Sequence, residues 1–402
     1  MIDYENLLSD QVKKLQPSGI RRFSELAAEM DDVISLGVGE PDFQTPWVIR
    51  QAGIESLERG RTHYSPNAGF KDLKLEICRY LERRMGLSYT PEETMVTVGG
   101  SEAIDMMIRA VVDPGDEVLI PEPCYVSYDP IARLSGAKVV SIPTRFEDDF
   151  CLTPEALKAA ITPKSKLLIF PYPNNPTGGI MRREDLEAIA EVLRGTNILV
   201  LSDEIYAELT YGGVKHVSIA SIEGMRERTI VVNGFSKTYA MTGWRLGYAV
   251  GPAPLIQQMI KIHQFAIMCA PTTSQYAAIE ALRSCDDEIE AMRDEYDLRG
   301  KYLVGELNRI GLKCFEPKGA FYVFPSIKCT GLTSEQFCVR LLQEEHVAVI
   351  PGDAFGSWGE GHVRISYCYS LRHLKIAIGK IEKFLNKLEG ERHASGQGEM
   401  SR

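Results

Sequence analysis

Short apolar runs recur along this chain, and each ends at a turn or a polar residue. Four of them are 94-TMVTV-98, 117-EVLI-120, 166-KLLIF-170 and 198-ILVLS-202. Runs of this length, bounded by Gly, Pro or Asp, are typical of buried strands. The pattern predicts a series of strands with polar loop residues at their ends.

Helical spacing appears between these runs. In 101-SEAIDMMIRAVV-112 the apolar residues Ile104, Met107, Ile108 and Val111 recur at i, i+3, i+4 and i+7, which places them on one helix face. Apolar strands that alternate with helices predict a largely parallel α/β sheet. Such sheets bind ligands at the carboxyl ends of their strands.

The pattern changes after about residue 283. A long charged helix is predicted over 286–311, and the short strands that follow it indicate a second, α+β unit. The last residues lack apolar periodicity, which predicts disorder. We therefore expect an N-terminal arm with part of a small domain (1–45), a large domain (46–283), the rest of the small domain (284–388) and a disordered tail (389–402).

The composition argues against several classes of partner. A formal net charge of −10 without a basic run disfavours nucleic acid and anionic membranes. No apolar run reaches about 18 residues, and the start of the chain lacks the order of a secretory signal, so we expect a cytoplasmic protein. The nine cysteines and seven histidines do not cluster at metal-ligand spacing, which predicts reduced thiols and no metal site.

Two cations stand in one loop between strand-like runs. The runs 229–232 and 246–250 enclose a loop that carries Lys237 and Arg245. Because the flanking runs are typical of buried strands, both charges are expected at the end of a sheet. The alternative is a surface loop with two ordinary cations.

Other polar residues also follow predicted strands. The turn 99-GGS-101 precedes a helix, whose first backbone N–H groups can hold a phosphate; it is also compatible with a plain turn. Glu102 suits the helix dipole but would repel an anion if it faced inward. Asp203 is either a cap or salt-bridge partner, or the partner of a cationic heterocycle. Asn175 stands in a Pro-rich turn and offers an amide donor.

A third cation lies in a later strand. In 361-GHVRISY-367, Arg364 and Ser366 alternate with the apolar residues Val363 and Ile365, so Arg364 points away from the apolar face. On this pattern alone, it is either an exposed edge-strand cation or part of a site.

Several motifs, taken in order, resemble the class I aminotransferases of fold type I, the aspartate and aromatic aminotransferase-like enzymes that use pyridoxal 5′-phosphate (PLP). The resemblance runs from about residue 18 to 385 and rests on 37-GVGEPDF-43, 64-YSPNAG-69, 172-YPNNPTG-178, 202-SDEIY-206, 235-FSKTYAMTGWRLGY-248 and 362-HVRISY-367. It implies a large domain with a mostly parallel seven-stranded sheet between helices, and a smaller α+β domain.

The resemblance also implies roles for the polar residues. Lys237 matches the lysine that holds PLP as an imine and then serves as the general acid and base. Arg245 matches the arginine that pairs with the phosphate. Asp203 matches the carboxylate that keeps the pyridine nitrogen protonated, which makes the ring an electron sink. Asn175 and Tyr206 match donors to the phenolic oxygen of the ring.

The remaining contacts to the cofactor follow in the same way. Tyr125 matches the aromatic residue that stacks on the ring. Gly100, Ser101 and Glu102, together with Ser236, match the residues that surround the phosphate.

On the substrate side, the resemblance assigns Arg364 to the α-carboxylate, with the backbone of Gly39 and the amide of Asn175 beside it. Substrate binding then draws the two domains together and expels water. Tyr64 matches a tyrosine that reaches the phosphate of the neighbouring subunit's cofactor, which implies a homodimer with shared active sites.

The chain departs from the family pattern at two positions. Many relatives have a hydroxyl residue where this chain has Gly234. The bacterial branch specific for aspartate often has a lysine where this chain has Ser101, so we expect neutral or aromatic donors, or a broad range. The implied reaction moves an amino group from an L-amino acid to a 2-oxo acid such as 2-oxoglutarate by a ping-pong route. The alternatives are an aspartate aminotransferase, a carbon–sulfur lyase on the same fold, and a PLP-binding regulator, which the absence of an N-terminal DNA-binding segment disfavours.

Overall fold

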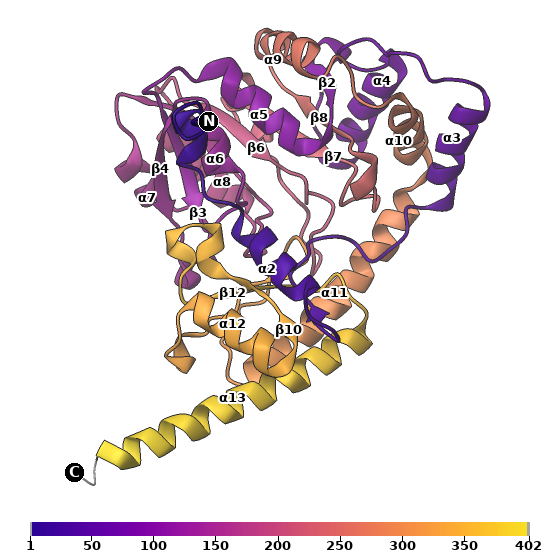
Figure 1. Cartoon of the computed structure of the whole chain (residues 1–402). Coiled ribbons are helices and arrows are strands. Elements are labelled where there is room, and N and C mark those ends of the chain that lie inside the picture. The colour runs from indigo at the N-terminus through magenta and orange to yellow at the C-terminus, as the bar shows by residue number, and fades with distance from the viewer. Residues whose placement is uncertain (1, 400–402) are drawn as a thin grey trace.

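The structure is a computed structural model that describes residues 2–399. The centre of the molecule is a seven-stranded sheet (Figure 1). The strand order is β2-β8-β7-β6-β5-β3-β4. The strands are β2 (Thr94–Thr97), β3 (Glu117–Glu122), β4 (Lys138–Pro143), β5 (Ser165–Phe170), β6 (Leu199–Asp203), β7 (Thr229–Gly234) and β8 (Gly247–Val250). Only β8 runs antiparallel to its neighbours in this sheet. The expected mostly parallel α/β sheet is confirmed.

Helices cover both faces of this sheet because its central strands are apolar on both sides. Leu167 and Ile169 of β5 face one layer of helices, whereas Leu168 and Phe170 face the other. The first layer contains α5 (Gly99–Val111), α6 (Tyr128–Leu134) and α9 (Ala253–Ala266). The second contains α4 (Lys71–Tyr80), α7 (Pro154–Ala160), α8 (Arg183–Leu193) and α10 (Thr272–Ser284).

The ends of three adjacent strands place the polar loops at one edge of the sheet. The parallel strands β5, β6 and β7 are followed by loops that begin at Pro171, Glu204 and Phe235. Helix α5 begins at Gly99, directly after β2, and its predicted apolar face is buried through Ile104, Met107 and Ile108, with Val111 partly buried.

A smaller unit lies beside this edge (Figure 1, orange and yellow). The smaller unit is defined here by two N-terminal elements and six C-terminal ones. These are α2 (Gly19–Ala28), β1 (Ile34–Ser35), β9 (Tyr322–Val323), α12 (Ser334–Glu345), β10 (Val347–Ala348), β11 (Ile350–Pro351), β12 (Val363–Ser366) and α13 (Leu371–Glu399). Its strands form the ladders β1-β10 and β11-β12-β9. The long helix α11 (Asp286–Arg309) contacts both β9 and α13. The boundaries between domains, near residues 45 and 283, stay a prediction.

The C-terminal segment differs from the expectation of disorder. Residues 389–399 continue α13, which projects away from the rest of the molecule (Figure 1). Apolar periodicity detects packing and not helix formation, so its absence over 389–399 does not exclude a helix. Residues 400–402 of the expected tail lie outside the described part of the chain. Within residues 2–399, no helix has the length and apolarity needed to cross a bilayer.

Candidate active site

A pocket of about 290 Å³ is lined both by loops at the polar edge of the sheet and by Tyr322 and Arg364 of the smaller unit. It collects most of the residues that the sequence nominated: Gly39, Gly100, Ser101, Tyr125, Asn175, Asp203, Tyr206, Ser236, Lys237, Arg245 and Arg364. Two nominated residues, Glu102 and Tyr64, do not line it. Tyr64 lies on the surface and is 80% exposed.

Lys237 enters the pocket from the loop between β7 and β8. Its ammonium donates a hydrogen bond to the carbonyl oxygen of Gly39, at 2.6 Å. The pKa of Lys237 is lowered to about 8, chiefly by burial and also by the positive charges of Arg364 and Arg245, against the opposing effects of Cys368 and Glu40. A lysine with this pKa is partly unprotonated at neutral pH, as a nucleophile or a base must be.

This lowered pKa makes a measurable prediction. In the cofactor-free protein, acylation of Lys237 by a small amine-directed reagent should rise with pH through a midpoint near 8. An unperturbed lysine has a pKa of about 10.4, because its ammonium is fully solvated. Peptide mass spectrometry after brief labelling gives the midpoint for each lysine. A midpoint above pH 10 for Lys237 would contradict the desolvation described here.

Asp203 occupies the last position of β6 and is 7% exposed. The phenol of Tyr128, on α6, donates to its Oδ2 at 2.7 Å, and the backbone N–H of Ile205 donates to its Oδ1 at 3.2 Å. Burial raises the pKa of Asp203 to about 6. No cation pairs with this carboxylate within residues 2–399, so it suits a cationic ligand group. Sequence reasoning missed Tyr128, which carries no strand-end or turn signal.

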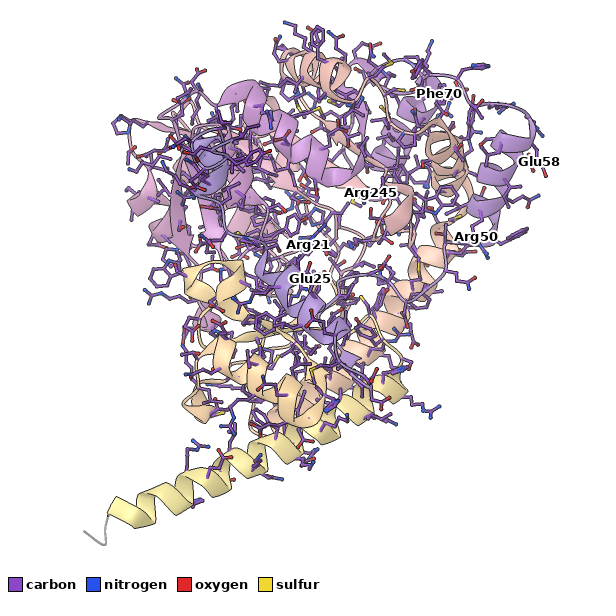
Figure 2. The ribbon with its side chains drawn as sticks, viewed as in Figure 1. Arg21, Glu25, Arg50, Glu58, Phe70 and Arg245 are labelled. Carbon is purple, nitrogen blue, oxygen red and sulfur yellow. The ribbon has the colours of Figure 1, made fainter. Side chains whose placement is uncertain are left out.

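Backbone packing brings Arg245 to the start of α5. A Cβ built on Gly99, whose φ is +75°, would lie 2.8 Å from Nη2 of Arg245, and one on Gly247 would lie 2.6 Å from the carbonyl carbon of Gly99. Arg245 also donates to the carbonyl oxygen of Thr242 at 3.0 Å. Figure 2 places Arg245 between the large sheet and α2. With Ser236 beside it, this helix N-terminus offers a site for a phosphate group.

The side chain of Glu102 is turned away from this anion site. Its carboxylate accepts a hydrogen bond from the backbone N–H of Val98 and lies 2.8 Å from Nδ1 of the buried His263. That Glu102 helps to surround a phosphate stays a prediction, and with its carboxylate bonded elsewhere the group left for this role is its backbone N–H. The turned carboxylate also removes the repulsion that an inward glutamate would exert.

Gly234 has no space for the hydroxyl side chain that many relatives carry. A Cβ there would lie 3.0 Å from Cα of Gly247 and 3.1 Å from Cδ1 of Ile205. A larger residue at Gly234 would therefore require its neighbours to shift, whereas a Cβ on Gly247 would clash with the backbone at the start of α5.

Arg364 lies at the opposite end of the pocket and is only 2% exposed. The hypothesis of an exposed edge-strand cation is wrong, because β12 is the middle strand of its ladder. Its guanidinium donates to Oδ1 of Asn175 at 2.9 Å and to the carbonyl oxygen of Gly37. The rings of Tyr322 and Phe355 flank it, with centroids 4.5 and 4.8 Å from Cζ. Such a stacked, hydrogen-bonded fork is suited to a carboxylate.

Tyr322 is a second residue that sequence reasoning missed. Its hydroxyl lies 3.0 Å from the hydroxyl of Tyr206. A Cβ on Gly39 would lie 1.9 Å from the same hydroxyl, so only glycine fits there. Tyr322 thus joins the part of the pocket that holds Tyr206 to the part that holds Arg364. Tyr125, by comparison, lines the pocket as nominated, with its ring edge-on to that of Tyr128 at 5.5 Å.

These groups fit PLP as a bound cofactor. The unpaired carboxylate of Asp203 suits a protonated pyridine nitrogen, and Arg245 with the start of α5 suits a phosphate. Lys237 has the pKa of a reactive amine. The amide nitrogen of Asn175 can donate to a ring oxygen, because its carbonyl oxygen already accepts from Arg364.

Comparisons with known proteins agree with this arrangement. The sequence pattern of "Aminotransferase class I and II" matches residues 31–381. The chain is 51% identical to the "Putative aminotransferase YugH" of Bacillus subtilis and 47% identical to an aspartate aminotransferase of Pyrococcus abyssi, in both cases over 94% of this chain and 98% of the relative. The crystal structure of an aromatic aminotransferase from Pyrococcus horikoshii superposes with a TM-score of 0.88, at 45% identity, over 91% of this chain and 99% of that one. The chain belongs to the class I and II aminotransferases, and it is a PLP-dependent transaminase of fold type I.

Proposed function

We propose that this aminotransferase takes neutral or aromatic L-amino acids, within a broad range, and passes the amino group to a 2-oxo acid such as 2-oxoglutarate by a ping-pong route. The observation that carries the proposal is the convergence of Lys237, Asp203 and Arg364 on one pocket. The bound cofactor would supply an electron sink for the bond that breaks at the substrate Cα.

The chain's own residues would divide the remaining tasks. Arg364 binds the α-carboxylate that all amino acid and 2-oxo acid substrates share, and its flanking rings fix the orientation of the substrate. Lys237 removes the proton from the substrate Cα and returns it two atoms away, which completes a 1,3-proton shift. Asn175 and Tyr206 would hold the ring oxygen, and Asp203 keeps a proton on the ring nitrogen. The smaller unit, which carries Arg364, closes on the large sheet and excludes water.

A spectroscopic panel tests the reaction. Single amino acids are added to the purified holoenzyme, and loss of the visible absorbance band of the bound cofactor is recorded. 2-Oxo acids are then added to restore the band. Full recovery with a 2-oxo acid supports transamination through two half-reactions. Release of ammonia and pyruvate without recovery would indicate a carbon–sulfur lyase instead.

The choice of side chain is expected to depend on Ser101. Its short hydroxyl lines the pocket and cannot neutralise a distal carboxylate, whereas a neutral or aromatic side chain leaves no buried charge unpaired. Ser101→Lys should therefore raise kcat/KM for aspartate relative to phenylalanine by at most about tenfold to a hundredfold, an upper limit for one partly solvated ion pair. Steady-state kinetics with both donors give this ratio.

Ser101→Ala is the matched control for this prediction. It removes the hydroxyl without adding a charge, so the ratio between aspartate and phenylalanine should stay near that of the wild type. A wild-type enzyme that already prefers aspartate strongly over phenylalanine, tyrosine and alanine would contradict the argument from Ser101. The enzyme would then be an aspartate aminotransferase that recognises the distal carboxylate elsewhere.

We also propose a homodimer with shared active sites. Apolar side chains lie exposed near Tyr64: Phe265, close to the end of α9, is 87% exposed. The amide of Asn67 donates to the carbonyl oxygen of Met268 at 2.7 Å, which holds the loop of Tyr64 against that helix end. Exposed apolar surface of this kind supports a subunit interface.

Mixing two inactive variants tests the shared site. If Tyr64 serves the neighbouring pocket, a mixed dimer of Tyr64→Phe and Lys237→Ala subunits holds one site with both residues intact. Its activity should then approach half that of the wild-type dimer, provided that each variant alone is severely impaired. Mass measurement verifies subunit exchange. Exchange without any gain in activity would rule out the shared site.

We further propose that the enzyme works in the cytoplasm. All nine cysteines are free thiols, five of them buried, which suits a reducing compartment.

A further inference from the structure

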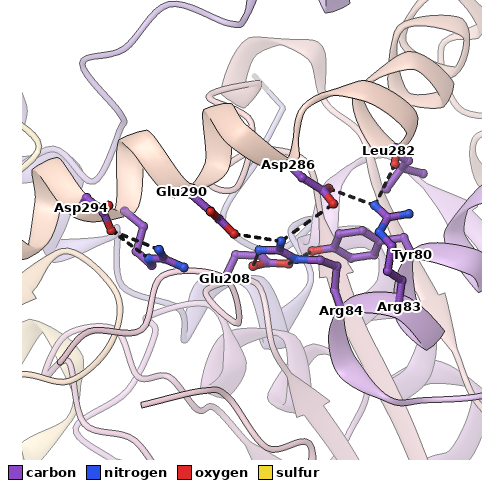
Figure 3. Close-up of polar contacts among 9 residues, drawn as sticks. Tyr80, Arg83, Arg84, Glu208, Leu282, Asp286, Glu290 and Asp294 are labelled. Atoms are coloured by element: carbon purple, nitrogen blue, oxygen red, sulfur yellow. Dashed lines mark hydrogen bonds and ion pairs between the residues drawn. The ribbon is translucent and has the colours of Figure 1, made fainter. Parts of the chain in front are cut away.

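A polar network surrounds Glu208, in the segment that follows β6 and carries active-site residues. Figure 3 shows the side chains of this network. Its centre is Glu208, two residues after Tyr206 and 8% exposed. The carboxylate accepts a hydrogen bond from the phenol of Tyr80 at 2.6 Å. It accepts two more from Arg84, on helix η1 (Leu81–Met85), namely from Nε at 3.0 Å and from Nη2 at 2.7 Å. Three donors therefore fix one buried carboxylate.

The backbone around Glu208 is a chain of turns that carries two nominated site residues. Asp203 is fixed at one end by the pairing of β6 with β7. At the other end, the carbonyl oxygen of Leu209 accepts from the N–H of Ala320, near the smaller unit. Between these points the segment has no regular helix or strand. The backbone N–H of Leu209 donates to the carbonyl oxygen of Tyr206 at 2.9 Å, and side-chain anchors such as Glu208 hold these turns in addition to such backbone bonds.

Arg84 also reaches the helix that leads to the smaller unit. Its Nη1 lies 3.4 Å from a carboxylate oxygen of Glu290 and 3.9 Å from one of Asp286, both at the start of α11. Figure 3 shows the guanidinium of Arg84 between Glu208 and these two residues. The side chains of Arg84 and Glu208 are 17% and 7% exposed. Because Glu290 and Asp286 are much more exposed, the paired fork on Glu208 is the stronger contact.

We propose that Glu208, held by Tyr80 and Arg84, is a positioning residue: it fixes the turn segment that follows Asp203, and with it Tyr206, against the bound cofactor. The proposal rests on the proposed roles of those two residues. Well-packed neutral groups can stabilise a buried site as well as an ion pair does. If Glu208 only stabilised the fold, its replacement would therefore leave binding of the cofactor to the folded protein unchanged. The bidentate pair adds a fixed orientation, which a site of this kind requires.

Glu208→Gln tests the proposal, because glutamine keeps the shape and an acceptor for Tyr80 but removes the charge. In the apo-protein, the Kd for PLP, read from quenching of tryptophan fluorescence, should rise about tenfold, the lower end of the effect typical of residues behind a ligand. In the holoenzyme, the pH midpoint of the visible absorbance band should shift, and kcat should fall with little change in KM. A melting curve monitors the fold.

The chain offers a matched control in Glu76. This carboxylate is 7% exposed, and its Oε1 accepts from Nε and Nη2 of Arg283 at 2.9 and 2.7 Å and from Nη1 of Arg79 at 2.8 Å, but it lies outside the site segment. Glu76→Gln should lower the melting temperature as Glu208→Gln does. It should leave the Kd for PLP within about twofold of the wild-type value. The pH midpoint of the absorbance band should stay within a fraction of a pH unit of the wild-type midpoint. If Glu208→Gln changes only the melting temperature, the proposal is overturned.

Two further variants keep the test decisive. If Glu208→Gln does not fold, Tyr80→Phe removes one donor and leaves the Arg84 pair, and a rise in the Kd for PLP of at least about twofold is expected from the loss of one hydrogen bond. An unchanged Kd there overturns the proposal. Asp203→Asn tests the proposed role of Asp203, on which the positioning role rests. If Asp203→Asn leaves the Kd for PLP and the absorbance midpoint unchanged, both roles are rejected. A normal Asp203→Asn effect beside an unchanged Glu208→Gln rejects positioning alone.

Discussion

Replacing Lys237 with alanine is expected to lower turnover by at least roughly two to four decades while noncovalent cofactor binding persists. The contacts of Arg245 and Asp203 do not depend on the lysine, so the ring and phosphate sites stay in place. What disappears is the amine that carries the proton to and from the substrate Cα. Single-turnover absorbance kinetics measure the loss, and absorbance after gel filtration reports the retained cofactor.

Lys261→Ala provides the control for this loss. Lys261 is an exposed lysine on α9 that bonds only with Gln258 on its own helix, so its removal should not change turnover. A small primary amine added to Lys237→Ala should recover part of the rate, because it can enter the vacated space and carry the proton. Near-normal turnover without added amine would exclude Lys237 as the proton carrier.

Replacing Asp203 with asparagine is expected to slow exchange of the substrate α-proton by roughly a hundredfold to a thousandfold, the usual effect of removing one fixed electrostatic contact in a site. The phenol of Tyr128 can still donate to the amide oxygen, so the local shape is preserved. The amide carries no charge and cannot keep a proton on a ring nitrogen. Exchange in deuterated water, followed by NMR, measures the effect; unchanged exchange would leave Asp203 a purely structural role.

The same carboxylate gives the cofactor-free protein a defined pH dependence. Burial raises the pKa of Asp203 from its ordinary 3.8 to about 6, so the folded chain binds this proton more tightly than the unfolded chain does. Its contribution to stability therefore falls as pH rises from 3.8 to about 6, and above that range a buried charge without a cation remains. A cationic ring would relieve it, so the stabilisation by PLP should be larger above pH 6 than below.

The large sheet and the pocket that it borders could be predicted because their signals are local. The apolar run that ends at Ser202 predicts both the strand and the placement of Asp203 at its end. Lys237 and Arg245 lie in a loop between two such runs, which fixes their side of the sheet. In each case the neighbouring residues in sequence are also the residues that determine the position.

Other features depend on contacts between distant segments. Arg364 alternates with apolar residues as an exposed cation would, yet the rings of Tyr322 and Phe355 and the loop of Asn175 bury it. Glu102 faces away from the pocket because His263, on another helix, offers it a partner. None of these partners belongs to the same strand or helix as the residue that it contacts. The periodicity of that strand or helix therefore does not reveal the contact.

The surroundings of Arg364 also affect how tightly a substrate can bind. A free arginine side chain loses up to about 2 kcal/mol of rotational entropy when it is ordered. Here the two flanking rings and the bonds to Asn175 and Gly37 impose that order during folding. A carboxylate that arrives would meet a preorganised fork, so the cost of ordering this side chain is not subtracted from its affinity. Substrates of very different side chains can then share one strong anchor, and selectivity is left to the opposite end of the pocket.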